Sequence, residues 1–287
     1  MLYLGCAVWA FPGWVGDFYP AKSSPGKFLQ LYGERLTAVE GNTTFYSIPD
    51  QITVKRWAAQ VPEGFRFCPK LPRAYSHQGP LLPHLPAALK FLEIMAPWGN
   101  KLGPVFIQLP PTYSPAAMAD LRAFLQGWPV QTVPVSVEVR HLGWFQPEPA
   151  QALNVLLKSL GVGRVLLDTR PIYDPMEDGQ GDPQIQSERR KPKVPLQPVV
   201  TAPFTLVRYI SHPEFDLNEP YLTEWVARLN QWLNQGTDVY VFVHCPDEAQ
   251  SPEIARHLYQ QLQAAYPNLD PLPWDQITPD PAQLTLF

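Results

Sequence analysis

Short apolar segments alternate with longer segments of helical period along most of this chain. This alternation is typical of a parallel sheet in which each strand is followed by a helix. Strands are expected near residues 2–8, 36–42, 64–70, 103–109, 134–140, 162–168, 204–210 and 238–244. Eight such units fit one barrel of about 250 residues. The 287 residues therefore predict an α/β fold, a single (β/α)8 TIM barrel with its core over residues 2–263.

The segments between the expected strands carry helix signals. A serine precedes a proline at Ser24, Ser114 and Ser251, which predicts a capping hydroxyl followed by a proline in the first turn. The clearest helix follows Asn218, because its apolar side chains recur at three- and four-residue spacing. They are Leu222, Trp225, Val226, Leu229, Trp232 and Leu233.

Two segments depart from the alternation. Residues 171–200 are polar and proline-rich, and they predict a long flexible loop after the sixth strand. We interpret the charged run from Glu188 to Lys193 as a solvated part of this loop. Residues 266–287 are expected to be a proline-rich C-terminal tail that wraps the surface. Neither segment resembles a second domain, so residues 1–287 are expected to form one domain.

The composition argues against several classes of protein. The net charge is −4, whereas a nucleic-acid-binding domain usually has a basic excess. No signal peptide is visible, and no apolar run approaches the roughly 20 residues of a membrane span. Cys6, Cys68 and Cys245 have no metal-binding or paired spacing, which is typical of a reducing compartment. We expect a soluble, cytoplasmic protein without membrane contact, for which nucleic acid is not the favoured partner.

Side-chain alternation along the strands assigns polar residues to the inside of the barrel. Val135, Val137 and Val139 share one face of the fifth strand, and their apolar character directs that face to the helices. Glu138 and Arg140 then point inward. The same argument on strands two to eight predicts these inward residues near the strand ends: Glu40, Asn42, Lys70, Gln108, Glu138, Arg140, Asp168, Arg208 and His244. Barrel enzymes build their active sites at this end.

Four residues are candidates for catalysis: Glu40, Glu138, Lys70 and Asp168. Glu40 and Glu138 are the main acid–base candidates, because two carboxylates in different surroundings are held at different pKa values. Lys70 is in addition a candidate Schiff-base nucleophile, since lysine amines attack carbonyl carbons.

A structural role is the alternative for this set. Charged groups near the centre of a barrel are costly unless they are paired or solvated. Glu138 with Arg140 would be one such pair, and Asp168 would form another with Arg208. We favour a functional role, because seven strands contribute polar groups at the same end.

A second group of residues is expected to bind the substrate. Lys70, Arg140 and Arg208 are expected to converge on a phosphate or carboxylate, which arginine binds through two parallel hydrogen bonds. Tyr46 and Trp144 are candidates to stack on a sugar or base, with packing under loops as the alternative. The predicted binding residues are Asn42, Tyr46, His77, Gln108, Arg140, His141, Trp144, Arg208 and His244.

The sequence contains no metal-binding motif of the HxH or HExxH type. No cofactor is therefore predicted. A divalent metal such as Zn or Mn, which accepts oxygen and imidazole ligands, is left open on four residues. They are Glu138, Asp168, His212 and His244. His141 is equally a candidate to cap backbone groups.

Several blocks of the sequence resemble one protein family. They are Gly5–Trp9, Trp14–Pro20, Val39–Tyr46, Phe65–Lys70, Phe106–Pro111 and Val137–Trp144, together with Trp57 and His77. The patterns Glu-x-Asn-x-Thr-Phe-Tyr and Glu-x-Arg-His-x-x-Trp are the most specific. Over residues 3–262 the chain resembles the YecE-like family, a domain of unknown function. The resemblance implies a TIM barrel similar in shape to the endonuclease-IV and sugar-isomerase barrels, and it implies no reaction.

The chain departs from the family pattern in its second half. Where the family tends to have Arg-x-His-Gly after strand seven, this chain has Arg208-Tyr-Ile-Ser-His212-Pro. Where the family often ends strand eight with Asn, this chain has His244, and Ser76 replaces the usual Thr before His77. The later strand ends are therefore expected to bind a different ligand, or to bind it more weakly.

These observations predict an uncharacterised barrel enzyme, a hydrolase or isomerase. It is expected to act by acid–base chemistry on a small anionic substrate that resembles a sugar or nucleotide. One alternative is a metal-dependent, nucleic-acid-processing barrel similar to endonuclease IV. Another is a non-catalytic protein that binds an anion or a partner. The sequence does not indicate the oligomeric state.

Overall fold

The computed structural model describes residues 1–177, 179, 181–185 and 190–277. Each of the eight expected strand ranges contains a strand. They are β1 (Leu2–Cys6), β2 (Ala38–Gly41), β3 (Arg66–Pro69), β4 (Val105–Gln108), β5 (Val135–Glu138), β6 (Gly163–Asp168), β7 (Phe204–Ile210) and β8 (Asp238–His244). The apolar segments therefore predicted the strands correctly, with bounds shorter by a few residues at several ends.

The strands form two parallel sheets. A curled six-stranded sheet has the order β1-β8-β7-β6-β5-β4, and β2 pairs with β3 in a second sheet. Hydrogen bonds link the two sheets at both junctions. The amide of Thr37 donates to the carbonyl of Leu4 over 3.1 Å, and the amide of Leu71 donates to the carbonyl of Phe106 over 3.0 Å.

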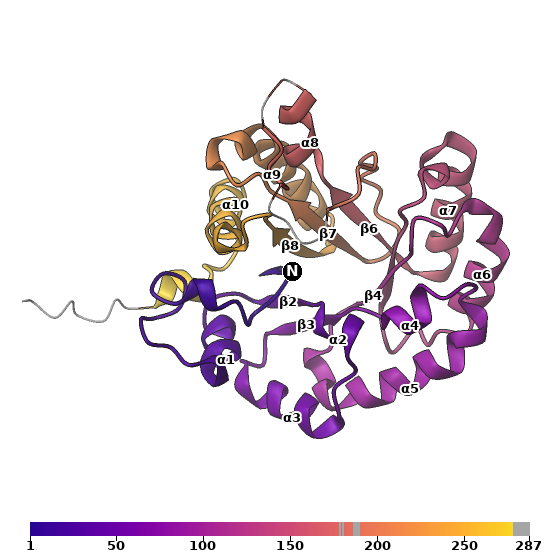
Figure 1. Cartoon of the computed structure of the whole chain (residues 1–287), viewed down its shortest axis with the longest axis horizontal. Coiled ribbons are helices and arrows are strands. Elements are labelled where there is room, and N and C mark those ends of the chain that lie inside the picture. Colours follow the sequence, from indigo (N-terminus) through magenta and orange to yellow (C-terminus); the bar gives the residue numbers. More distant parts are fainter. Residues whose placement is uncertain (178, 180, 186–189, 278–287) are drawn as a thin grey trace, which may run out of the picture.

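Helices surround the strands on the outside (Figure 1). They are α1 (Phe28–Gly33), α2 (Thr43–Tyr46), α3 (Gln51–Gln60), α4 (Arg73–Ser76), α5 (Leu85–Met95), α6 (Met118–Gln126), α7 (Pro147–Leu160), α8 (Arg170–Glu177), α9 (Glu219–Asn234) and α10 (Ser251–Ala265). The prolines after Ser24, Ser114 and Ser251 do lie in first turns, but none of the three serine hydroxyls makes a capping hydrogen bond. Ser251 is itself the first residue of α10, so the proline was the reliable signal.

The core has two parts, one on each face of the strands. The inner cluster contains residues from both sheets: Tyr3, Ala38, Cys68, Phe106, Val165, Phe204, Leu206, Tyr240 and Phe242. The outer core, against the helices, includes Val39, Val137, Val207 and Val241. This division confirms the predicted alternation on strands two to five, seven and eight.

The predicted alternation on strand six is wrong. Val165 belongs to the inner cluster, whereas Leu166 belongs to the outer core. Asp168, which shares the face of Leu166, accepts a hydrogen bond of 2.8 Å from the indole of Trp225 on α9. Arg170 also binds both oxygens of Asp168. Residues 165–167 are all apolar, so the sequence offered no contrast from which to choose the inner face.

Part of the predicted loop after strand six is ordered structure. Residues 170–177 form α8, and Val194 is buried against Ile172 and Ile210. Within the predicted charged run, Glu188 and the residue after it lie outside the described residues. In the tail, the ring of Trp274 packs on Phe18 at 4.8 Å, while residues 278–287 lie outside the described part. Within the described ranges, no helix has the length and apolar content needed to span a membrane.

Candidate functional site

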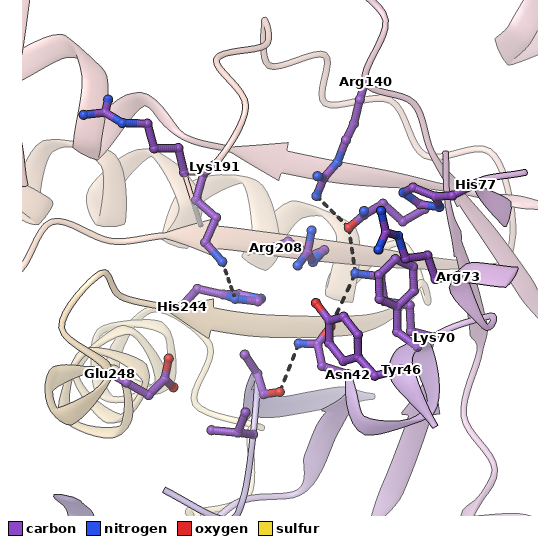
Figure 2. Close-up of a pocket in the computed structure, with 15 residues that line it drawn as sticks. Asn42, Tyr46, Lys70, Arg73, His77, Arg140, Lys191, Arg208, His244 and Glu248 are labelled. Carbon is purple, nitrogen blue, oxygen red and sulfur yellow. Dashed lines mark hydrogen bonds between the residues drawn. The ribbon is translucent and has the colours of Figure 1, made fainter. Parts of the chain in front are cut away.

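A cavity of about 570 Å³ lies at the carboxyl ends of the strands (Figure 2). Its lining side chains come from segments far apart in the chain, because parallel strands deliver their ends to one edge. They include Asn42, Phe45, Tyr46, Lys70, Arg73, His77, Gln108, Arg140, Arg190, Lys191, Arg208, His244 and Glu248. Among these described residues six are lysine or arginine and one is acidic, so cationic side chains dominate the lining.

Arg208 on β7 is the centre of a buried ion-pair network beneath the cavity. Its Nε and Nη2 donate to the two oxygens of Glu40 on β2, at 2.7 and 2.9 Å. Its Nη1 donates to Glu138 Oε2 on β5 at 2.5 Å. One guanidinium thus joins both sheets through two carboxylates, all three groups being almost completely buried.

Both glutamates are held as carboxylates. Burial alone would raise the pKa of Glu138, but Arg140 and Arg208 lower it to about 2. Burial opposes ionisation of Glu40 as well, and Arg208 with His244 holds its pKa well below the usual range. These groups are ionised at neutral pH and engaged by arginine on both oxygens. The predicted Glu138–Arg140 pair is present at 2.6 Å, whereas Asp168 and Arg208 do not pair.

Lys70, which follows β3, is buried without a carboxylate partner among the described residues. Its Nζ donates to Gln108 Oε1 at 2.7 Å and to Asn42 Oδ1 at 3.4 Å, and lies 4.0 Å from the centre of the Phe45 ring. Burial, with the nearby charge of Arg208, lowers the pKa of Lys70 to about 7. A neutral amine is therefore well populated near pH 7.

The amide partners of Lys70 are themselves fixed. Gln108 Oε1 also accepts from Arg140 Nη2 at 2.6 Å, and Asn42 Nδ2 donates to the carbonyl of Ala7 at 3.1 Å. Figure 2 shows Lys70, Arg73, His77 and Arg140 gathered at one end of the cavity. Burial lowers the pKa of His77 to about 4, so its ring adds no charge there.

The other end of the cavity holds Lys191, His244 and Glu248 (Figure 2). Burial lowers the pKa of His244 to about 4, and its Nε2 donates to the Glu40 carboxylate at 2.8 Å. Its Nδ1 is then free to accept from Lys191 Nζ at 3.4 Å. Burial lowers the pKa of Lys191 to about 8 and raises that of Glu248 to about 7. Glu248 Oε1 is buried and has no hydrogen-bond partner among the described residues.

The structure brings most of the predicted site residues together. Asn42, Tyr46, Lys70, His77, Gln108, Arg140, Arg208 and His244 line the cavity, and Glu40 and Glu138 lie directly behind Arg208.

Four predicted site residues lie elsewhere. Asp168 faces the helices, as described above. His141 Nδ1 accepts from the amide of Gly143 at 3.0 Å, which is the capping role that the sequence left open. Trp144 is fully buried and its indole donates to the carbonyl of Tyr113 at 2.7 Å. His212 Nδ1 accepts from the amide of Glu214 at 2.9 Å. These three rings have local structural partners and do not line the cavity.

The four residues considered as metal ligands are not assembled. Asp168 lies on the outer face, and Glu138 is enclosed by Arg140 and Arg208. Across the part of the chain that the structure describes, no group of three or more His, Cys, Asp or Glu side chains could hold a metal ion. The charged side chains that line the cavity are instead mainly cationic.

Sequence reasoning missed Arg73, Arg190, Lys191 and Glu248. Arg73 and Glu248 follow β3 and β8 by a few residues, at the start of short helical turns, and their closeness to the strand ends was the available signal. Lys191 belongs to the run that we interpreted as solvated, yet its side chain enters the cavity (Figure 2). None of these four residues belongs to a strand, so alternation gave no direction for their side chains.

The fold and the site define an α/β protein of parallel strands within a layer of helices, with a cationic cavity at the strand ends. Residues 3–277 match the family model described as "Protein of unknown function DUF72", and the chain belongs to this family, as the YecE-like resemblance predicted. It is 35% identical over 274 residues to the UPF0759 protein YecE of Escherichia coli K12, covering 95% of this chain and 97% of the relative. The YecE protein of strain O157:H7 gives the same identity and coverage.

Solved structures of two DUF72 family proteins share the fold. The protein from Thermotoga maritima MSB8 matches with a TM-score of 0.67 and 18% identity, covering 92% of this chain and 99% of that one. The protein from Enterococcus faecalis V583 matches with a TM-score of 0.64 and 21% identity, covering 94% and 98%. At these identities the likeness concerns the fold alone.

Proposed function

We propose that this chain is a (β/α)8 barrel enzyme that binds a small organic anion at its strand ends and acts on it by proton transfer. The hydrogen bonds at both junctions of the two sheets, and the inner cluster that they share, support one interrupted barrel. The three buried free thiols, Cys6, Cys68 and Cys245, support a reducing, cytoplasmic location.

The excess of cations in a cavity of about 570 Å³ is the observation that carries this proposal. Glu40 and Glu138 neutralise Arg208 and Arg140 from behind, whereas Lys70, Arg73 and Lys191 form no ion pair with a described carboxylate. An anion such as a phosphate or carboxylate supplies the missing countercharge. The volume admits a sugar- or nucleotide-sized molecule.

Proton transfer is assigned to the groups that titrate near neutral pH, namely Lys70 and Glu248. Glu40 and Glu138, the main acid–base candidates from the sequence, serve in this proposal to hold Arg208 and Arg140 in place. This chemistry fits a hydrolase or an isomerase. The alternative, a metal-dependent, nucleic-acid-processing barrel, would need several acidic or histidine side chains close enough to bind one metal ion. No such group is present among the described residues.

Calorimetric titration with ribose 5-phosphate tests the anion site. We expect it to bind at least tenfold more tightly than ribose, because the phosphate reaches the Arg73 end of the cavity. Removing one charged donor in Arg73→Ala should weaken binding about tenfold. Arg73 is exposed, so the fold should tolerate the change.

Arg122→Ala is the matched control, because Arg122 is an exposed arginine on α6 that does not line the cavity. Equal affinities for ribose and ribose 5-phosphate would contradict the proposal. So would an equal loss of affinity for ribose 5-phosphate in Arg73→Ala and Arg122→Ala. Exchange of a carbon-bound hydrogen of the sugar phosphate in D2O, followed by NMR, separates an enzyme from a protein that only binds the anion.

A further inference from the structure

Lys70 and Lys101, the two lysines with the least exposed surface among the described residues, are held in very different ways. Lys101 Nζ donates to the carbonyls of Ala58 and Val61 at 2.9 and 3.0 Å and pairs with the Glu63 carboxylate at 2.9 Å. These acceptors compensate the buried charge. Lys70 has two neutral amide oxygens, one of them at 3.4 Å, and no described carboxylate partner.

The surroundings of Lys70 disfavour its charged form. Arg208 and Arg140 lie on the same side of the cavity, and both hydrogen-bond acceptors of the amine are uncharged (Figure 2). A lysine that served only to hold the fold would be expected to resemble Lys101. The placement of Lys70 instead presents an amine, with an available lone pair, to a cavity built for an anion.

We propose that Lys70 forms an imine with the carbonyl group of a small anionic substrate. This inference rests on the proposed function, and it narrows the substrate to an anionic aldehyde or ketone, such as a phosphorylated sugar or a keto acid. Arg73 and Arg140 would bind the anionic group at the same end of the cavity. Nζ attacks the carbonyl carbon, forming the C–N bond, and one amine proton moves to the carbonyl oxygen.

Loss of water completes the step and needs a proton donor. Glu248 lines the same cavity at its opposite end, and burial raises its pKa to about 7, so its protonated fraction would supply the proton through solvent in the cavity. Its proton leaves with the hydroxyl group as water when the C–O bond breaks. The products are a protonated imine on Lys70, the Glu248 carboxylate and one water molecule, and nothing is oxidised or reduced.

Reductive trapping with dihydroxyacetone phosphate and sodium borohydride tests this inference on the unmodified protein. Borohydride delivers hydride to the imine and leaves a stable secondary amine, which peptide mass spectrometry locates. We expect Lys70 to be modified at least fivefold more than Lys101, and the yield to rise between pH 6 and 8. Inorganic phosphate should compete with the probe.

Lys70→Arg keeps the charge and cannot form an imine, so it should lose the adduct, whereas Lys101→Arg, at a residue that does not line the cavity, should retain it. Modification of Lys191 or of exposed lysines in place of Lys70 would overturn the inference. If the protein binds ribose 5-phosphate but Lys70 stays unmodified, the imine inference is wrong and the proposed anion site stands. Failure of both probes to bind would overturn the proposed function as well.

Discussion

Replacing Arg208 with methionine is expected to lower the free energy of unfolding at neutral pH by about 3–5 kcal/mol. The substitution leaves Glu40 and Glu138 ionised and buried, without the guanidinium that binds three of their four oxygens. Urea unfolding monitored by circular dichroism measures the loss. Arg208 is 2% exposed, so solvent cannot replace its hydrogen bonds without a change in structure.

The loss of stability in Arg208→Met should depend on pH. In the wild-type protein the pKa of Glu138 is about 2, below its unfolded value, so its pairing stabilises the fold above pH 4 and the effect is lost only as pH falls towards 2. Without Arg208 both carboxyls are expected to take up protons more readily. The cost of the substitution should therefore be smaller at pH 5 than at pH 8.

Arg164→Met provides the matched control. Arg164 on β6 is also 2% exposed, but its Nη1 donates to the amide oxygen of Asn154 and not to a carboxylate, and its Nη2 has no hydrogen-bond partner among the described residues. Its replacement leaves no buried carboxylate without a partner, so the free energy of unfolding should change by about 1 kcal/mol or less. Equal losses in the two variants would show that the Arg208 network does not hold the sheets together.

Replacing Lys70 with methionine is expected to stabilise the protein by about 2–4 kcal/mol at pH 6. Lys70 has a pKa of about 7 in the folded chain, below its unfolded value, so its burial as a cation is costly below pH 7. The cost declines as pH rises from 7 towards 10, because folding then removes a proton that the unfolded chain holds less and less tightly. The gain in the free energy of unfolding of Lys70→Met, measured by urea unfolding, should therefore decline over the same pH range.

Lys101→Met is the control for this prediction. Lys101 is 8% exposed and satisfied by one carboxylate and two carbonyls, so its replacement should destabilise the protein. A loss of stability in Lys70→Met comparable to that in Lys101→Met would contradict the view that Lys70 is kept for function at a cost to the fold.

The sequence predicted the site where polar and apolar residues alternate. On β5 the alternation of Val135 and Val137 with Glu138 fixed the inner face, and the structure agrees. On β6 the residues before Asp168 are apolar on both faces, so the parity was reversed and Asp168 was wrongly included. Alternation carries information only where the two faces differ in chemistry.

The pairing of side chains was harder to predict than their direction. The sequence suggested Arg140 as a partner of Glu138, which is correct, but it could not show that Arg208 reaches across to Glu40. That contact depends on how the two sheets curl toward each other, and the alternation of residues within a single strand does not predict this curvature. Arg73 and Glu248 were missed because each begins a short helical turn after a strand, and the direction of such a turn depends on tertiary packing.

The central claim is that the strand-end cavity is an anion site. Crystals grown with selenate, a tetrahedral anion with a strong anomalous signal, test it most directly. We predict a selenium peak in the cavity, with the selenate oxygens within hydrogen-bond distance of Arg73, Arg140 and Lys70. Selenate peaks confined to the outer surface, with the cavity occupied by water alone, would contradict the account.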